Sequence, residues 1–592
     1  MARRLSALLL CGALLLSLLS GCATEKIPQE SLADTVAPEE EPQEESVSGA
    51  EIPVEAPAEE QPAGPAASRG IVWQADEGLH PYTCTSVANQ VVLSLLYESL
   101  FVVDGSFETR PLLCESCAVS EDGKVWHFDL RQDVTFSDGS GLTSGDVVTS
   151  LQAAKSSSLY RLRFENVTSI ERDGTYGVII RLSTAHENLP MLLDIPIVKG
   201  ATVSSAVPLG TGPYAMGSSA LEQNHNWWQS GTPVVDAGRL ELIHAEDALA
   251  VRNSFEFGGA DLAYTDPGAS TLAAFHSDNE RWGCPTTVML YLGFNQSSNY
   301  FYSATLRSGV TFAVDRESIV SDIYGGFGLA ASLPCSPQSS LYDSALASSY
   351  TYNPGSFQAC LQASGVQPNP GSPVKLIVSD VNPKRVQTAQ TIARQLTDLG
   401  VMTEVTTYGE EDFQYALAVG NFDLYLAEIR LPTNFDLSCF FLYGSSACVG
   451  SNQSDSALQL CRAALENSGN CYDLYRTVMS RGLICPVMFK VNALYATRGV
   501  LRDCQPAVST LLYGGSDLTL ADILSETPYE APAYQPPEEE PEDITLPGEE
   551  PEEDEPGEDE GGGDPNDPET GEGGEPTGET DPGATPETTP EG

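Results

Sequence analysis

The sequence predicts an α/β fold, and two observations support this prediction. Between residues 373 and 429, three short apolar runs alternate with two amphipathic helices, which end at Gly400 and Gly420. This βαβαβ order is typical of a parallel sheet covered by helices. Residues 122–151 add a half-buried strand followed by a helix. With 592 residues, of which 41% are apolar, the chain is long enough for two or three domains with real cores.

The strand within residues 122–151 is predicted by the alternation of apolar and polar side chains. Apolar and polar side chains alternate over residues 126–131, which is the pattern of a strand with one buried face. Asp138 and Gly139 tolerate left-handed dihedral angles and favour a turn. Thr143 follows as the expected N-cap of a helix, with Asp146 in its first turn.

Other elements are predicted along the chain by the same patterns. We expect strands at 70–74, 178–182 and 485–489, a helix from about 87 to 101, a helix capped by Asp315, and an ordered region that ends near residue 524. Gly210 and Gly212 are expected to supply dihedral angles that other residues resist. Gly309 is expected to weaken the helix in which it lies.

The first 22 residues have the composition of an export signal. Two arginines precede a short, mostly apolar stretch, and Leu19-Ser-Gly-Cys22 resembles the lipobox of bacterial lipoproteins. Lipid attached to Cys22 would anchor the protein to a membrane without a spanning helix. A plain secretory signal is the alternative.

Two acidic segments flank the region expected to fold. Residues 23–68 carry 12 acidic residues and one lysine, and residues 531–592 carry 23 acidic residues and no basic one. Both segments have few large apolar residues, so we expect a disordered linker at 23–68 and a disordered tail at 529–592. The net charge of −54 argues against nucleic acid as a partner, because phosphate binding needs clustered lysines and arginines.

Twelve cysteines remain after Cys11 and Cys22 are set aside. An even number in an exported protein favours disulfides. Cys114 and Cys117 could form a disulfide or remain free thiols; a zinc site is less favoured because no second close cysteine pair or suitable histidine follows. Cys439 and Cys448 are close enough in sequence to pair.

Four motifs resemble those of one protein family. They are W-x-F-x-L-R-x-x-V-x-F-S-D-G at residues 126–139, the G-T-G-P-Y of residues 210–214, the segment of residues 306–319, and C-P-V-M-F at residues 485–489. The sequence thereby resembles the family 5 solute-binding proteins of bacterial ABC importers, which bind oligopeptides, dipeptides or nickel.

The resemblance implies a two-lobed fold of the class II periplasmic-binding-protein type, with hinge segments between lobes that close on a ligand. The expected lobe I is 69–298 with a return at 490–528, and lobe II is 299–489. The expected partners are a membrane permease with cytoplasmic ATPases and a small solute, most simply a peptide. The protein would face outside the cytoplasm, held at the membrane by its lipid. No cofactor is expected.

The resemblance also implies a ligand site in the loop 428–437. In peptide-binding members of the family this loop often reads D-Y-P-D-P, and its later Asp pairs with the α-ammonium group of the peptide. Asp436 matches that position by offset, and Asn434, Phe435 and Tyr82 are further candidates for ligand binding. Asp436 could instead only cap a following turn.

Other functions stay open at this point. A nickel chelate or a sugar is an alternative ligand, although the six histidines are scattered along the chain and no metal site is expected. A sensor or adhesin on the same fold is a second alternative. An extracellular hydrolase is disfavoured because H-E-x-x-H and G-x-S-x-G are absent, so no catalytic residue is predicted.

Overall fold

The computed structural model describes residues 68–229, 233–235, 237–269, 275 and 278–534. The predicted export signal, Cys22 and the acidic linker up to residue 67 lie outside the described residues, as does the chain from residue 535 onward. Among the described residues, no helix is long and apolar enough to cross a membrane.

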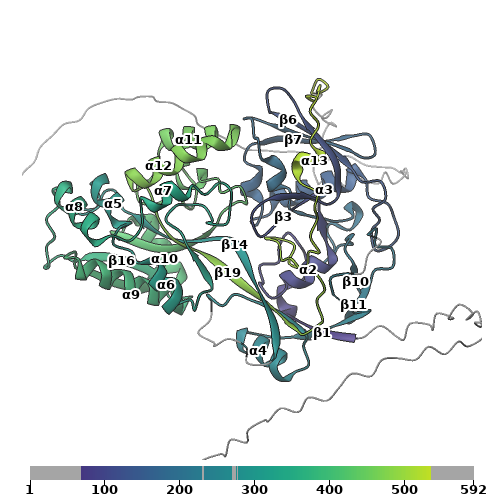
Figure 1. Cartoon of the computed structure of the whole chain (residues 1–592), viewed down its shortest axis with the longest axis horizontal. Coiled ribbons are helices and arrows are strands. Elements are labelled where there is room, and N and C mark those ends of the chain that lie inside the picture. Colours follow the sequence, from purple (N-terminus) through teal and green to yellow (C-terminus); the bar gives the residue numbers. More distant parts are fainter. Residues whose placement is uncertain (1–67, 230–232, 236, 270–274, 276–277, 535–592) are drawn as a thin grey trace, which may run out of the picture. The chain divides into compact units, whose positions relative to one another are not determined.

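An 11-stranded mixed sheet runs through the described part of the chain (Figure 1). Its strands, in spatial order, are β10 (Tyr214–Met216), β11 (Ala220–Gln223), β12 (Arg239–His244), β1 (Ser68–Trp73), β13 (Leu262–Thr265), β19 (Cys485–Thr497), β14 (Asn279–Phe294), β18 (Leu424–Arg430), β16 (Val374–Ser379) and β17 (Thr403–Tyr408), with β15 (Gly328–Ala330) beside β19.

The two longest strands, β14 and β19, connect two lobes. They pair antiparallel along most of their length, and each contributes to hydrophobic cores on both sides (Figure 1). Lobe I surrounds a core built from residues 71–284 and 494–512. Lobe II contains two cores built almost entirely from residues 289–489. The mixed α/β, two-lobed fold expected from the sequence is confirmed.

The βαβαβ unit is confirmed in lobe II. Strand β16 is parallel to both β17 and β18, and the connections are α9 (Pro383–Asp398) and α10 (Glu410–Val419). Gly400 and Gly420 both take positive φ angles after these helices, +90° and +72°. The glycines therefore end the helices in a conformation that other residues resist.

Lobe I contains a separate four-stranded antiparallel sheet in the order β5 (Cys114–Val119), β6 (Val125–Leu130), β8 (Gly177–Leu182), β7 (Val167–Asp173). Trp126, Phe128 and Leu130 are buried on one face of β6, as the alternation predicts. Thr143 and Asp146 form the expected capping box at the start of α3 (Ser144–Ser156). These sequence predictions are confirmed.

The helix predicted at 87–101 is wrong at its ends. Helix α2 covers only Gln90–Leu96, and Tyr97 is already extended. The next residues form β2 (Glu98–Ser99), which pairs with β9 (Pro196–Ile197), and β3 (Phe101–Val103), which pairs with β4 (Thr109–Pro111). The pairing of β2 with residues about a hundred positions away, and of β3 with the nearby β4, outweighs the local helical pattern.

The remaining helices cover the sheets and connect their strands. They are α4 (Ala248–Phe257), α5 (Ala304–Val310), α6 (Arg316–Asp322), α7 (Ser344–Ser348), α8 (Pro354–Ser364), α11 (Asp455–Glu466), α12 (Cys471–Arg481) and α13 (Leu520–Ile523), with short 3₁₀ turns at Ala75–Glu77, Arg161–Phe164, Leu189–Leu192, Gly200–Thr202, Ser438–Phe440 and Ser468–Asn470. Asp315 caps α6 as predicted, since its carboxylate accepts from Ser318 N.

Gly210 and Gly212 are needed for a reason other than the one expected. Neither has a positive φ angle. A Cβ atom at Gly210 would lie 2.0 Å from the carbonyl oxygen of Leu96, and one at Gly212 would lie 2.4 Å from that of Leu95. These glycines allow their backbone to approach the end of α2 closely.

The expectation of disulfides is wrong for the structure described. All twelve cysteines outside the signal are free thiols, including Cys439 and Cys448, and nine are buried. Cys114 and Cys117 both enter the lobe I core, since a bulge between residues 114 and 116 reverses the alternation of β5. Buried free cysteines pack as small apolar side chains.

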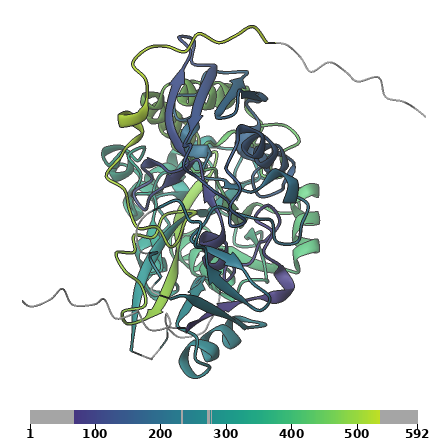
Figure 2. The same cartoon turned by 90° about the vertical axis from the view of Figure 1, so that its right-hand side faces the viewer.

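The C-terminal segment, residues 524–534, lies against the four-stranded sheet (Figure 2). The backbone N–H groups of Ser525 and Tyr529 donate to carbonyls of β5, at 2.8 and 2.9 Å. The Tyr529 ring stacks on His127 of β6, with centroids 4.7 Å apart, and Arg181 of β8 donates to Pro532 O at 2.8 Å. Residues 529–534 therefore contact lobe I, although their composition had placed them in the disordered tail.

Candidate functional site

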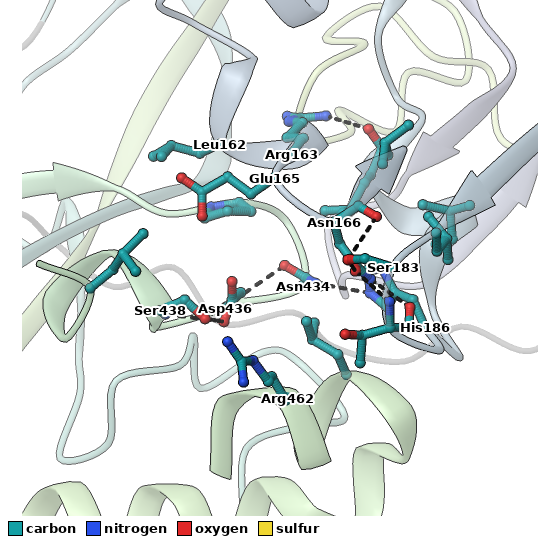
Figure 3. Close-up of a pocket in the computed structure, with 18 of the residues that line it drawn as sticks. Leu162, Arg163, Glu165, Asn166, Ser183, His186, Asn434, Asp436, Ser438 and Arg462 are labelled. Carbon is teal, nitrogen blue, oxygen red and sulfur yellow. Dashed lines mark hydrogen bonds between the residues drawn. The ribbon is translucent and has the colours of Figure 1, made fainter. Parts of the chain in front are cut away.

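A cavity of about 590 Å³ lies between the two lobes (Figure 3). Lobe I contributes residues between Leu162 and Leu192, and lobe II contributes residues between Pro432 and Leu465. The lobe II wall includes the loop that follows β18. This placement agrees with the rule that ligand sites lie beyond the carboxyl ends of parallel strands.

The loop after β18 is fixed by contacts with lobe I. Thr433 Oγ1 donates to the carbonyl oxygen of Met191 at 2.6 Å. The Asn434 amide donates to Nε2 of His186 at 3.1 Å, so this ring nitrogen is an acceptor. Burial lowers the pKa of His186 to about 4, which keeps the ring neutral and the hydrogen bond intact near neutral pH.

Asp436 lines the cavity and is half-buried. Its Oδ1 accepts hydrogen bonds from the backbone N–H and the hydroxyl of Ser438, at 3.1 and 2.8 Å. Asp436 thus caps the turn that follows, as the simpler sequence interpretation allows. Burial raises the pKa of the Asp436 carboxyl above its usual range, and the hydrogen bonds from Ser438 oppose that shift.

Glu165 borders the same cavity from lobe I. Burial raises the pKa of Glu165, and the negative charge of Asp436 raises it further. Asp436 lies between Glu165 and Arg462 in the view of Figure 3, yet neither carboxylate forms a salt bridge with Arg462 or with any other residue that the structure describes. The two lobes therefore present two unpaired carboxylates to one cavity.

Two of the residues predicted to bind ligand lie elsewhere. Phe435 is 1% exposed, and its ring packs against Phe107 and Phe489 with centroids 5.0 and 5.6 Å away. Tyr82 is 3% exposed, and its hydroxyl donates to Pro196 O at 2.8 Å inside lobe I. Asn434 and Asp436 line the cavity, whereas Phe435 belongs to a core of lobe II and Tyr82 to the core of lobe I.

A second cavity of about 340 Å³ adjoins the first, and Arg163 lines both. Asp194 forms an ion pair with Arg163 through one oxygen, while its other oxygen is buried without a hydrogen-bond partner. The hydroxyl of Ser509, on the same cavity, is also buried and unpartnered. Arg430 adds an exposed cation. Among the described residues, two buried polar atoms beside this cavity therefore lack a hydrogen-bond partner.

The sequence prediction missed Arg163, Glu165 and Asp194. One signal was present for Asp194, which interrupts the apolar run Leu192-Leu-Asp-Ile-Pro-Ile197, since a charged residue inside such a run is often buried and paired. Glu165 had no comparable signal. Its position beside Asp436 depends on how the lobes meet. Across the described residues, no group of three or more metal-ligating side chains is assembled.

Comparisons with known proteins agree with this fold. Residues 108–452, more than half of the chain, match the family "Bacterial extracellular solute-binding proteins, family 5 Middle". The glutathione-binding protein GsiB of Escherichia coli is 24% identical over 350 residues, which cover 55% of this chain and 67% of GsiB.

Two solved structures show the same fold at low sequence identity. The ABC transporter substrate-binding protein CtaP of Listeria monocytogenes superposes with a TM-score of 0.64 at 16% identity, over 76% of this chain and 98% of CtaP. The oligopeptide-binding protein AppA of Bacillus subtilis, solved with a nonapeptide, has a TM-score of 0.53 at 20% identity, over 74% of this chain and 95% of AppA. The chain therefore belongs to family 5 of the bacterial extracellular solute-binding proteins, the substrate-binding proteins of ABC importers.

Proposed function

We propose that this protein is lipid-anchored outside the cytoplasm and captures short peptides between its two lobes for delivery to an ABC permease. Lobe I would comprise residues 69–298 with 490–528, and lobe II residues 299–489. A peptide ligand is consistent with the names of two similar proteins, the glutathione-binding GsiB and the oligopeptide-binding AppA.

The observation that carries this proposal is the pair of unpaired carboxylates, Asp436 and Glu165, in one cavity between the lobes. Burial destabilises the ionised form of both carboxyls, and the charge of Asp436 adds to this effect at Glu165. A peptide α-ammonium group placed between them would relieve both effects. Because the two carboxylates come from different lobes, the ligand would also hold the lobes together.

The first test replaces Asp436 with Asn. We expect Asp436→Asn to weaken binding of a free-amine peptide by about 1–3 kcal/mol, the size of a lost charge-assisted hydrogen bond, with little effect on the N-acetylated peptide. Calorimetry on both peptides measures this difference. Asp380→Asn, an exposed position in lobe II away from the cavities, is the matched control. Equal affinities of wild type and Asp436→Asn for the free-amine peptide would remove Asp436 from the site.

Affinity for the free-amine peptide should also fall at low pH. The raised pKa values of Asp436 and Glu165 mean that both carboxyls take up protons at higher pH than ordinary ones. A bound ammonium favours their ionised forms, so protonation competes with binding. The loss of affinity should therefore begin above the usual carboxyl range and be smaller in Asp436→Asn.

Anchoring through Cys22 is tested separately. Cys22→Ala should release the protein from the membrane fraction, because it removes the thiol that lipid attachment needs. Immunoblotting of fractionated cells that express the full chain measures this. A Cys22→Ala protein that stays membrane-associated would contradict the anchor and leave the ligand site unaffected.

A further inference from the structure

A third cavity between the lobes has a volume of about 690 Å³ and takes no part in the proposed recognition of the ammonium group. Lobe I contributes residues of α4 and β13 to its wall. Lobe II contributes residues that follow α6 and the first turn of α9, among them Tyr324, Phe327 and Lys384. It is larger than either cavity described above.

Aromatic side chains from both lobes line this third cavity. Tyr264 and Tyr495 come from strands of lobe I, and Tyr324 and Phe327 come from lobe II. Buried aromatic rings form favourable contacts with other rings and with large apolar groups. The wall thus suits an aromatic or large aliphatic side chain better than a small polar one.

Two cations stand beside these rings. The half-buried side chain of Arg252 lines the cavity and forms no salt bridge with another residue that the structure describes, so its charge is available to a ligand. Lys384 donates to the carbonyl oxygen of Pro267 at 2.9 Å. Of the two acidic residues in the wall, Asp266 already pairs with Lys490, and Asp322 is exposed and accepts from Ser321. Among the described residues, Arg252, Lys384 and Asp322 are the charged groups of this wall without a salt bridge, so the unpaired charge at this end is net positive.

The three cavities adjoin in a fixed order. Arg163 lines both the first and the second cavity, and Val87 and Tyr264 line both the second and the third. One end of this series carries the unpaired carboxylates Asp436 and Glu165, which outnumber the one unpaired cation there, Arg462. The other end carries aromatic rings and Arg252. An extended peptide has the same polarity, from its ammonium group to its carboxylate.

We propose that the third cavity binds an aromatic or large aliphatic residue at the carboxyl end of a peptide, with the terminal carboxylate at Arg252 and the ammonium group at the Asp436 end. This inference rests on the proposed function and narrows its substrate class to extended peptides with a large apolar C-terminal residue.

The test uses the full chain and a series of alanine peptides of about three to eight residues, since an extended chain spans about 3.3 Å per residue. Each length is made with either Phe or Ala as the last residue. We expect calorimetry to show about tenfold tighter binding of the Phe peptide at the lengths that reach the third cavity.

The variant Ala248→Trp, which fills the cavity from α4, should abolish this preference for Phe over Ala. Leu249→Trp, the exposed neighbour on the same helix, should retain it.

A second variant tests the carboxylate. Arg252→Gln should weaken binding of the Phe peptide with a free carboxylate about tenfold and leave its C-terminal amide unaffected. The inference is overturned if the Phe and Ala peptides bind equally well at every length, or if Arg252→Gln does not distinguish acid from amide. If the Phe and Ala peptides bind equally well, the proposed function as a peptide-binding protein still holds. If no peptide binds the wild-type protein, both the proposed function and this inference are overturned.

Discussion

At the scale of single residues, Glu98 is a carboxylate held inside lobe I without a salt bridge to any residue that the structure describes. It is 6% exposed and accepts hydrogen bonds from Thr211, Trp227, Trp228 and, more weakly, Gln229. Burial raises its pKa from 4.5 to about 7, although these donors favour the ionised form. The free-energy cost of burying the ionised carboxylate therefore exceeds the stabilisation that these uncharged hydrogen-bond donors provide.

This shift makes stability depend on pH. Between pH 4.5 and about 7, folded Glu98 keeps a proton that the unfolded chain has released, so the free energy of unfolding decreases as pH rises through this range. The full effect is about 3 kcal/mol. Urea unfolding at pH 5 and at pH 7.5 should show that Glu98→Gln lacks this decrease. An unchanged pH dependence in Glu98→Gln would show that the carboxyl titrates normally.

At the scale of elements, Gly309 illustrates how tertiary contacts override helix propensity. A Cβ atom at Gly309 in α5 would lie 2.6 Å from the Cβ of Cys360 in α8. The glycine that weakens the helix in isolation thus permits the two helices to pack closely. Gly355, in the first turn of α8, has only Asn353 Oδ1 nearby, at 3.4 Å.

We expect Gly309→Ala to destabilise the protein by about 1–3 kcal/mol, because overpacking exceeds the gain in helix propensity of about 1 kcal/mol. Gly355→Ala is the matched helical control and should be neutral or slightly stabilising. Denaturant midpoints of the two variants decide the matter. Equal unfolding midpoints for Gly309→Ala and Gly355→Ala would contradict this prediction, since they would mean that α5 and α8 can move apart with little loss of stability.

Elements with a strong local pattern could be predicted from the sequence. The alternation in β6 and the glycines that end α9 and α10 act over a few residues, and all three elements are present. The end of α2 could not be predicted, because β2 forms only against residues 196–197. The residues of the candidate site also differ in how far the sequence could predict them. Asp436 follows a recognisable strand, whereas Glu165 is brought to it only by the meeting of the lobes.

At the scale of the whole molecule, a buried ion-pair cluster joins the lobes. Lys490 of β19 pairs with Asp266 of lobe I and lies 3.6 Å from Glu428 of β18, whose Oε1 has no hydrogen-bond partner. Nearby, the side-chain amide of Asn382 in lobe II donates to Gly268 O in lobe I at 3.0 Å. One buried ammonium group therefore balances carboxylates from both lobes.

Replacing Lys490 with Met should cost about 3–5 kcal/mol, because it removes the ammonium group that two half-buried carboxylates share. The triple variant, with Asp266→Asn and Glu428→Gln added, should recover most of this loss. Chemical unfolding measures the stability, and small-angle scattering measures any separation of the lobes. If the triple variant is no more stable than Lys490→Met alone, the cluster does not act as a charge-balanced unit.

The C-terminal segment on the four-stranded sheet has a mechanical consequence. Strand β1 begins at Ser68 in the sheet of lobe I, and the segment that ends at Tyr534 also lies against lobe I. A pulling force applied at these two residues would be borne first by lobe I, by the β1–β12 pairing at one end and by the contacts of Tyr529 at the other. Lobe II, inserted between β14 and β19, would lie outside the path of the load.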